Sequence, residues 1–317
     1  MFSLPLVLHI PDGFLTPAVS LSGWVLAVLL IWVAIRHTEA QFGEKQAPLM
    51  GVVAAFIFAA QAINFPIAAG TSGHVLGGAL AGILMGPWAG ILIMTSVIVV
   101  QGLLFQDGGL LVMGWNILSM GVFSVLAGYA AYSGILRLFP KWGKAGTIAA
   151  FTAAWLSVEA SAVATAVVLS VSGTFPLYLS LPSLTGVYAL VGLGEGIVTA
   201  AALGLLLASR PEVLQRSQAL AGRFSASLLT IGLAICGILV LLSPYASQAP
   251  DGLETVAEAG GFATLAEEPV YEVFPAYSVD LLDGTSYYST VAAILIGTIL
   301  VFSLVSMVGQ FAARAEE

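Results

Sequence analysis

Two histidines lie beside glycine-rich turns in a chain that is otherwise strongly apolar. His9 begins the sequence His-Ile-Pro-Asp-Gly, and His74 directly follows Gly70-Thr71-Ser72-Gly73. Histidine is the commonest metal-binding side chain, so two imidazoles brought to a common face would start a transition-metal site. The alternative for each histidine is a hydrogen-bonded polar residue of the core that binds no metal.

The other donor groups narrow the kind of metal. The single cysteine, Cys236, lies in an apolar stretch and is interpreted as a small buried hydrophobe, and His37 beside Arg36 as a solvated surface residue. Without clustered cysteines or convergent carboxylates, a structural zinc site and an oxygen-lined calcium or magnesium site are disfavoured. Nitrogen ligation suits nickel, copper or cobalt.

Two acids fall within predicted membrane helices. A carboxylate at membrane depth is costly, which makes Glu159 and Glu195 functional candidates. Glu195 also lies in Gly192-Leu193-Gly194-Glu195-Gly196, whose small residues allow close helix approach, so the alternative is a hydrogen bond to a neighbouring backbone. A membrane enzyme using these acids and a histidine is a rival function, although no nucleophile–base pair or HExxH motif is visible.

Helices in a membrane must position these groups. Of the 317 residues, 59% are hydrophobic and only 8% are charged, and the mean hydropathy is +1.02. A soluble domain of this length cannot bury so much apolar surface. The net charge of −8, with nine Lys and Arg, excludes a nucleic-acid partner. We therefore predict an all-α polytopic helix bundle in the cell (plasma or inner) membrane.

Apolar stretches long enough to span about 30 Å of hydrocarbon define the helices. Seven are clear, at about 18–36, 48–68, 110–136, 146–171, 184–208, 224–245 and 289–311. The run 74–105 is either one tilted helix or two short ones broken at Gly86-Pro87, where proline removes a backbone donor. With the break and an extracytoplasmic N-terminus, all nine basic residues are cytoplasmic, whereas without it at most seven are. We predict nine helices, seven in a core and two appended, with the C-terminus cytoplasmic.

This topology places several segments at one extracytoplasmic mouth. They are the His9 segment, the turn before His74, the turn Gln106-Asp107-Gly108-Gly109 and the Ser172–Ser183 loop. The segment 246–288 also faces outward and carries eight acids and no basic residue. Its two interpretations are a cation-attracting surface and simply a soluble acidic loop. A second rival function is a structural or assembly membrane protein that uses this loop to bind a partner.

Five motifs follow one another along the chain. They are His9-Ile10-Pro11-Asp12-Gly13-Phe14-Leu15, Asn64-Phe65-Pro66, Gly70-Thr71-Ser72-Gly73-His74, Gln106-Asp107-Gly108-Gly109-Leu110 and Gly192-Leu193-Gly194-Glu195. Over about residues 9–208 they closely resemble the substrate-binding membrane (M) component of energy-coupling-factor cobalt/nickel importers. Residues 247–254, Ser-Gln-Ala-Pro-Asp-Gly-Leu-Glu, followed by a final helix, resemble the two-helix PDGLE-type N component. The expected division is a seven-helix metal-binding core (1–208), a cytoplasmic linker (209–223) and a fused N-like segment (224–317).

The resemblance implies capture of Ni²⁺ or Co²⁺ outside the cell and delivery across the membrane. Separate ATP-binding cassette ATPase subunits, acting through a membrane coupling (T) subunit, would supply the energy, since this sequence has no Walker motif. In the family the ion is held in a plane by the amino terminus, the amide and imidazole of the next histidine, and a later imidazole. Carried over, the ligands are His9, His74 and, if residues 1–7 are removed, Leu8. Supporting contacts are expected from Asp12, Asn64, Ser72 and Asn116.

Overall fold

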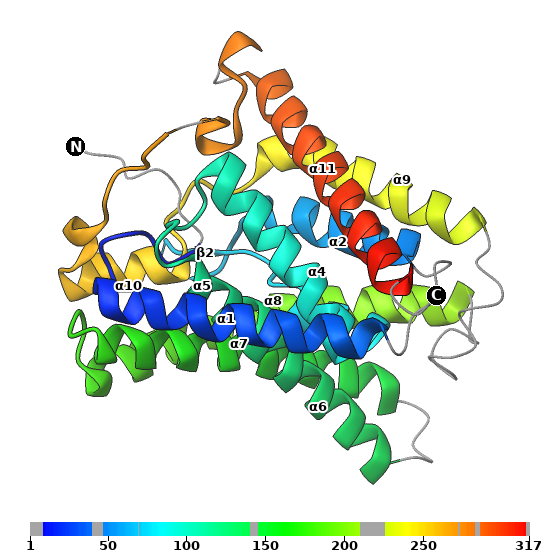
Figure 1. Cartoon of the computed structure of the whole chain (residues 1–317), viewed down its shortest axis with the longest axis horizontal. Helices are drawn as coiled ribbons and strands as arrows, with labels where there is room; N and C mark the ends of the chain where they lie inside the picture. Colours follow the sequence, from blue (N-terminus) through cyan, green and yellow to red (C-terminus); the bar gives the residue numbers. More distant parts are fainter. Residues whose placement is uncertain are drawn as a thin grey trace.

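The computed structural model describes residues 9–39, 47–68, 70–139, 145–209, 226–271, 273–282 and 286–314. Within these residues the chain is a bundle of helices (Figure 1). The long helices are α1 Pro17–Glu39, α2 Ala47–Gln61, α4 Pro87–Val100, α6 Ser124–Leu138, α7 Ala145–Val171, α8 Leu177–Ser209, α9 Ala226–Leu242 and α11 Tyr287–Arg314. The short ones are α3 Gly78–Met85, α5 Met113–Asn116 and α10 Gly252–Gly260, the π-helical turns η2 Gln101–Phe105 and η3 Ile117–Phe123, and the 3₁₀ turns η6 Ser243–Tyr245, η7 Ala263–Leu265, η8 Pro275–Tyr277 and η9 Asp280–Leu282.

Six helical stretches of the described chain are long and apolar enough to cross a membrane. They are α1, α4 with η2, the continuous α5–η3–α6 run, α7, α8 and α11, while α2 and α9 are shorter apolar helices. On α1 the large apolar side chains Leu21, Val25 and Trp32 are exposed, because lipid rather than protein solvates this helix. The prediction of a polytopic helical membrane protein is confirmed.

The predicted break at Gly86-Pro87 is also confirmed. Gly86 has φ +79°, which glycine adopts without a Cβ penalty, and Pro87 begins α4, where its missing N–H is not needed. The preceding helix, α3, has eight residues, about 12 Å at 1.5 Å per residue, so it cannot cross the hydrocarbon alone. The non-helical segment 72–77 leads into it.

Two expectations about this region are wrong. The helix expected over 48–68 ends at Gln61, and β1 (Phe65–Pro66) pairs antiparallel with β2 (Ser72–Gly73). The sequence places His74 at a helix start on the rim, but it lies on the non-helical segment before α3 and is 3% exposed. Distant side chains, described below, bond the backbone groups that a helix would otherwise pair.

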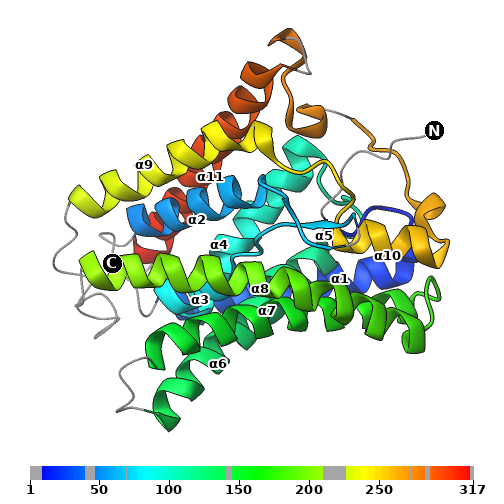
Figure 2. The ribbon, with the colours of Figure 1, turned by 180° about the vertical axis from the view of Figure 1, so that it is seen from behind.

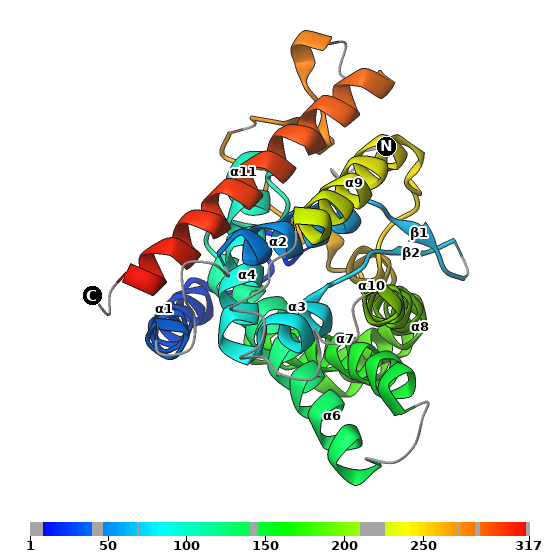
Figure 3. The same ribbon diagram turned by 90° about the vertical axis from the view of Figure 1, so that its right-hand side faces the viewer.

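The C-terminal helices pack on the core. α2 lies between α9 and α11 (Figure 3). The close approach depends on glycine, because a Cβ at Gly51 of α2 would meet Ser306 of α11, and a Cβ at Gly297 of α11 would meet Phe58 of α2. α2 leads directly into β1, so these contacts hold the base of the segment that carries the second histidine.

One end of the bundle gathers loops from distant parts of the chain (Figures 1 and 2). The Glu267 N–H donates to the Asp12 carbonyl at 2.9 Å, and the Gly109 N–H donates to the Ile10 carbonyl at 2.9 Å. In the loop before α1, the Thr16 N–H donates to Ser172 Oγ, in the turn between α7 and α8, at 2.6 Å. Arg36 lies in the last turn of α1, at the opposite end. We call the gathered loops the loop end; they are the segments that the sequence assigns to one mouth.

Candidate metal centre

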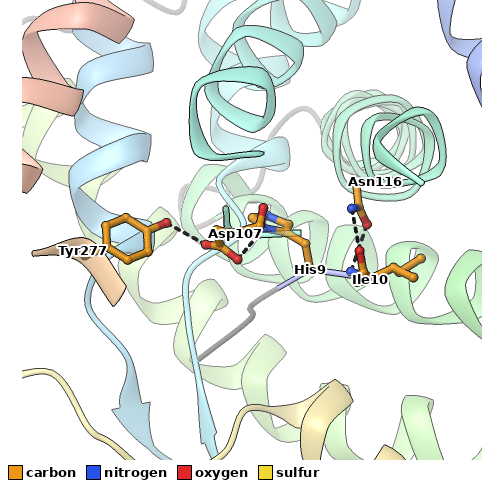
Figure 4. Close-up of polar contacts among 5 residues, drawn as sticks. All are labelled: His9, Ile10, Asp107, Asn116 and Tyr277. Atoms are coloured by element: carbon orange, nitrogen blue, oxygen red, sulfur yellow. Dashed lines mark hydrogen bonds and ion pairs between the residues drawn. The ribbon is translucent and has the colours of Figure 1, made fainter. Parts of the chain in front are cut away.

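The loop that carries His9 is fixed by two polar side chains. The Ile10 N–H donates to Asn116 Oδ1, and Asn116 Nδ2 donates to the Ile10 carbonyl, both at 3.0 Å (Figure 4). The Asp12 carboxylate accepts from the backbone N–H groups of residues 110–112 at 2.9, 2.9 and 3.1 Å. Both side chains form hydrogen bonds with backbone groups, and together they fix the position of the loop from which the His9 ring projects.

The segment that carries His74 is held by a carboxylate from α8. Glu195 is fully buried; its Oε2 accepts from the Leu76 N–H at 2.7 Å and its Oε1 from the Gly77 N–H at 2.9 Å. Gln61, at the end of α2, donates from Nε2 to the Leu76 carbonyl at 2.7 Å. These bonds satisfy backbone groups that no helix pairs. The structure therefore supports the alternative interpretation of Glu195, a hydrogen bond to neighbouring backbone.

A C-terminal segment lies over the β1–β2 pair. Ser72 donates from Oγ to the Ala249 carbonyl at 2.7 Å and from its N–H to the Pro250 carbonyl at 2.8 Å. The Ser247 N–H donates to the Asn64 carbonyl at 2.8 Å. We call the described residues 246–271 and 273–282 the cover. Ser72 and Asn64 hold the cover in place beside the histidines.

His9 and His74 lie together in the interior. Their ring centroids are 6.2 Å apart with the rings inclined at 63°, and the residues are 2% and 3% exposed. Among the described residues, His9 Nε2 and both ring nitrogens of His74 have no hydrogen-bond partner. A metal–imidazole bond is about 2 Å, so two rings binding one ion from opposite sides have centroids roughly 6 Å apart. The pair lines one small cavity with Asn116, Ser161 and Thr165, and its spacing fits a single ion.

The site contains a residue that the sequence-based site prediction omits, Asp107. His9 Nδ1 lies 2.9 Å from Asp107 Oδ1 and 3.0 Å from the Asp107 carbonyl (Figure 4). Because both oxygens accept hydrogen bonds, Nδ1 carries a proton, and in the neutral ring Nε2 keeps its lone pair. The sequence does contain the signal, the Gln106-Asp107-Gly108-Gly109 turn, but a turn aspartate is ordinarily explained by local backbone bonding. Tyr277, from the cover, donates its hydroxyl to Asp107 Oδ2 at 2.6 Å.

Burial and charge set the protonation of the pair. Burial and the neighbouring His9 lower the pKa of His74 to about 4, so this ring is neutral near pH 7. Burial alone would lower the pKa of His9, but the Asp107 carboxylate outweighs it and the pKa of His9 is raised. Burial would raise the pKa of Asp107, but its contacts with His9 and Tyr277 lower it. The His74 ring therefore offers a lone pair without losing a proton, whereas a protonated His9 ring would have to release one to bind a metal.

The remaining ligand positions are not filled by clustered side chains. The described residues contain no group of three or more His, Cys, Asp and Glu that could hold a metal. Leu8, the expected amino ligand, lies outside the described residues. A chelate through the amide and imidazole of one histidine needs Nδ1, the only ring nitrogen near its own amide. In this conformation Nδ1 of His9 is bonded to Asp107, and Nε2 is the nitrogen that His9 presents.

Comparisons with known proteins agree along the whole chain. Residues 9–213 match the CbiM family, described as the cobalt uptake substrate-specific transmembrane region, and residues 225–314 match the PDGLE domain. A putative fused nickel transport protein NikMN of Archaeoglobus fulgidus is 35% identical over 97% of this chain and 100% of its own length. The fused nickel transport protein NikMN of Rhodobacter capsulatus is 31% identical over 75% of this chain and 72% of its own.

A solved structure shares the core fold. It is described as a transition metal transporter and superposes with a TM-score of 0.58 at 27% identity, over 68% of this chain and all of its own. The fold and these relatives define the class, a multi-pass membrane protein of cobalt and nickel transport. The chain belongs to the CbiM cobalt uptake family, with a PDGLE domain in the same polypeptide, as in the fused NikMN relatives.

Proposed function

We propose that this chain is the substrate-specific membrane subunit of an energy-coupling-factor importer for Ni²⁺ or Co²⁺. The observation that carries the proposal is the buried pair His9 and His74, with unpartnered ring nitrogens and centroids 6.2 Å apart. Nitrogen ligands suit both ions, and nickel binds the more tightly of the two by the usual order of divalent metals. The names of the relatives, nickel transport protein and cobalt transport protein, support the same cargo.

In this proposal the loop end faces the outside of the cell and the C-terminus is cytoplasmic. The positive-inside rule supports that orientation, because the basic residues then all lie on the cytoplasmic side. Leu8 supplies a third nitrogen when the mature chain begins there. Residues 1–208 act as the metal-binding core, 209–223 as a cytoplasmic linker and 224–317 as the fused N-like segment.

Energy for import comes from other subunits in this proposal. A membrane coupling (T) subunit docks on the helical core and transmits ATP hydrolysis by ATP-binding cassette subunits. Uptake therefore requires co-expression with these partners, whereas metal binding is a property of this chain alone. The two properties are measured separately below.

The test is to replace His74 in the full-length chain. H74A, and H74Q with a side chain closer in volume, are expected to lose high-affinity Ni²⁺ and Co²⁺ binding, because the site then has one imidazole instead of two. His37→Ala is the matched control, since His37 is exposed and stacks on Trp88 at 4.5 Å, at the far end of α1. Equilibrium binding and thermal unfolding of purified protein are the measurements.

Three outcomes would contradict the proposal. Unchanged affinity in both His74 variants removes the histidine pair from metal capture. Turnover of a substrate by reconstituted protein without metal uptake favours the rival membrane enzyme. A parent chain that binds neither ion, with the correct N-terminus, favours an assembly protein whose acidic cover binds a partner.

A further inference from the structure

The cover carries a buried carboxylate, Asp251, at the residue that precedes α10. Its side chain belongs to a residue that is 1% exposed. Oδ1 accepts from the Glu254 N–H at 2.7 Å and so caps the helix, whereas Oδ2 is buried and has no hydrogen-bond partner in the described chain. A capping aspartate is ordinarily at the surface, where water satisfies the second oxygen. The cap therefore accounts for only one of the two oxygens.

The neighbours of Asp251 in sequence place it against the segment that carries His74. The residue before it, Pro250, accepts through its carbonyl from the Ser72 N–H at 2.8 Å. Two residues after it, Leu253 lines the same cavity as the two histidines. α10 lies beside β2 and α8 at the loop end of the bundle (Figure 3). The first turn of α10 is thus part of the surroundings of the metal centre.

No basic side chain of the described residues neutralises this carboxylate. The ion pair found among them joins His9 to Asp107 and does not include Asp251. The pKa of Asp251 is raised to about 7, first by burial and then by the negative charges of Glu254 and Asp107, while the Glu254 N–H and His9 oppose the rise. Asp251 is therefore within electrostatic range of the histidine pair. A buried anion is costly unless a positive charge lies close to it.

We propose that Asp251 supplies a negative charge that compensates the divalent ion held at His9 and His74, without being a ligand itself. Imidazole ligands are neutral, and in a buried site of low dielectric constant the free energy of a bound cation depends strongly on nearby anions. The inference rests on the proposed function, because it requires an ion at the histidine pair. It gives the fused C-terminal segment an electrostatic part in metal capture.

This charge acts in opposite directions on the metal-free and the metal-bound protein. In the metal-free protein the buried, unpaired carboxylate costs stability, and in the metal-bound protein it attracts the ion. A residue that only caps α10 behaves differently, because loss of a cap destabilises the protein whether or not a metal is bound. The stability of the metal-free protein therefore separates the two roles.

The experiment uses two substitutions of Asp251 in the full-length chain. D251N and D251S both remove the charge, and both keep a side-chain oxygen that can cap the helix, since Asn and Ser are good N-cap residues. Glu258→Gln is the matched control, because Glu258 lies on the same helix but is exposed, where water screens its charge. Equilibrium Ni²⁺ and Co²⁺ binding and thermal unfolding with and without metal are the measurements.

The expected result combines weaker binding with an undiminished fold. In D251N and D251S the affinity for both ions should fall by about tenfold or more, since a charge that acts in a buried site is poorly screened. The metal-free variants should unfold at the melting temperature of the parent or above it, and metal should raise that temperature by less than it does in the parent. E258Q should match the parent in every measurement.

The outcomes separate this inference from the function on which it rests. Parental affinity for both ions in D251N and D251S overturns the inference. So does a metal-free melting temperature below that of the parent in both variants, because Asp251 would then act as a helix cap. If H74A loses the ion while D251N binds as the parent does, the proposed function stands and the charge-compensating role falls. A parent that binds neither ion overturns the proposed function itself.

Discussion

Glu195→Gln provides a quantitative test of how the structure holds His74. Each Glu195 oxygen accepts one backbone N–H, from Leu76 and from Gly77, in a fully buried position. Glutamine keeps the shape but turns one acceptor into an NH₂ group that faces an N–H. A buried N–H left without its acceptor costs about 1–3 kcal/mol, so the variant is expected to lose about 1–3 kcal/mol of stability.

The loss acts on the backbone of Leu76 and Gly77. In our proposal His74, two residues before Leu76, binds the metal. If about 1.4 kcal/mol of it appears as a cost of ordering the segment on metal binding, nickel affinity falls about tenfold. Thermal unfolding and equilibrium nickel binding in detergent measure the two parts. Glu159→Gln is the control, since Glu159 is the other acid of a membrane helix and its Oε1 has no hydrogen-bond partner in the described chain. Equal effects of the two substitutions on both measurements would refute the reasoning.

Three further predictions concern the loop end and the orientation of the chain in the membrane. Gly108→Ala should weaken nickel binding by tenfold or more, because Gly108 has φ +93° and an added Cβ would stand 2.7 Å from the His9 Cβ. The control is Gly134→Ala, where an added Cβ has open space, and equally tight nickel binding by the two variants would contradict the prediction. For a chain that retains residues 1–7, so that Leu8 has no free amine, nickel affinity measured by titration at several pH values should fall as the pH drops below the raised pKa of His9. One proton should be displaced per ion, because His74, with a pKa of about 4, stays neutral; a two-proton slope near pH 6 in that chain would contradict this. In a chain with the buried Cys236 replaced, an impermeant thiol reagent should label Gly260→Cys only from outside and Leu138→Cys only from the cytoplasm, and the reverse pattern would invert the orientation.

The sequence was informative where composition and charge act over long stretches. Apolar runs and the asymmetry of basic residues predicted the helices and the break at Gly86-Pro87, because lipid solvation and helix geometry constrain them strongly. The pairing of His9 with His74 followed from placing two turns at the same end of the bundle. Those inferences need only the direction in which each helix crosses the membrane.

The sequence was uninformative where side chains far apart in the chain decide local structure. The apolar run after His74 looks like a helix start, but Glu195, 119 positions from Leu76, bonds the backbone of this non-helical segment. Asp107 looks like an ordinary turn residue until Tyr277 is placed beside it. Neither partner is visible as a local pattern, because the contact depends on how α8 and the cover pack.

The attachment of the cover has a consequence for how the site is completed. The cover meets the core through hydrogen bonds, including Ser72 to Pro250 and Tyr277 to Asp107, and through the buried apolar side chains Leu253, Val256 and Phe262. It is carried between α9 and α11, which both pack on α2. Within one polypeptide, a tethered segment faces its docking surface at an effective concentration on the order of millimolar. The contacts of the cover therefore form without recruitment of a separate protein at micromolar abundance. Every copy of this chain made in the cell comes with its own Tyr277, in a fixed one-to-one ratio with the histidine pair.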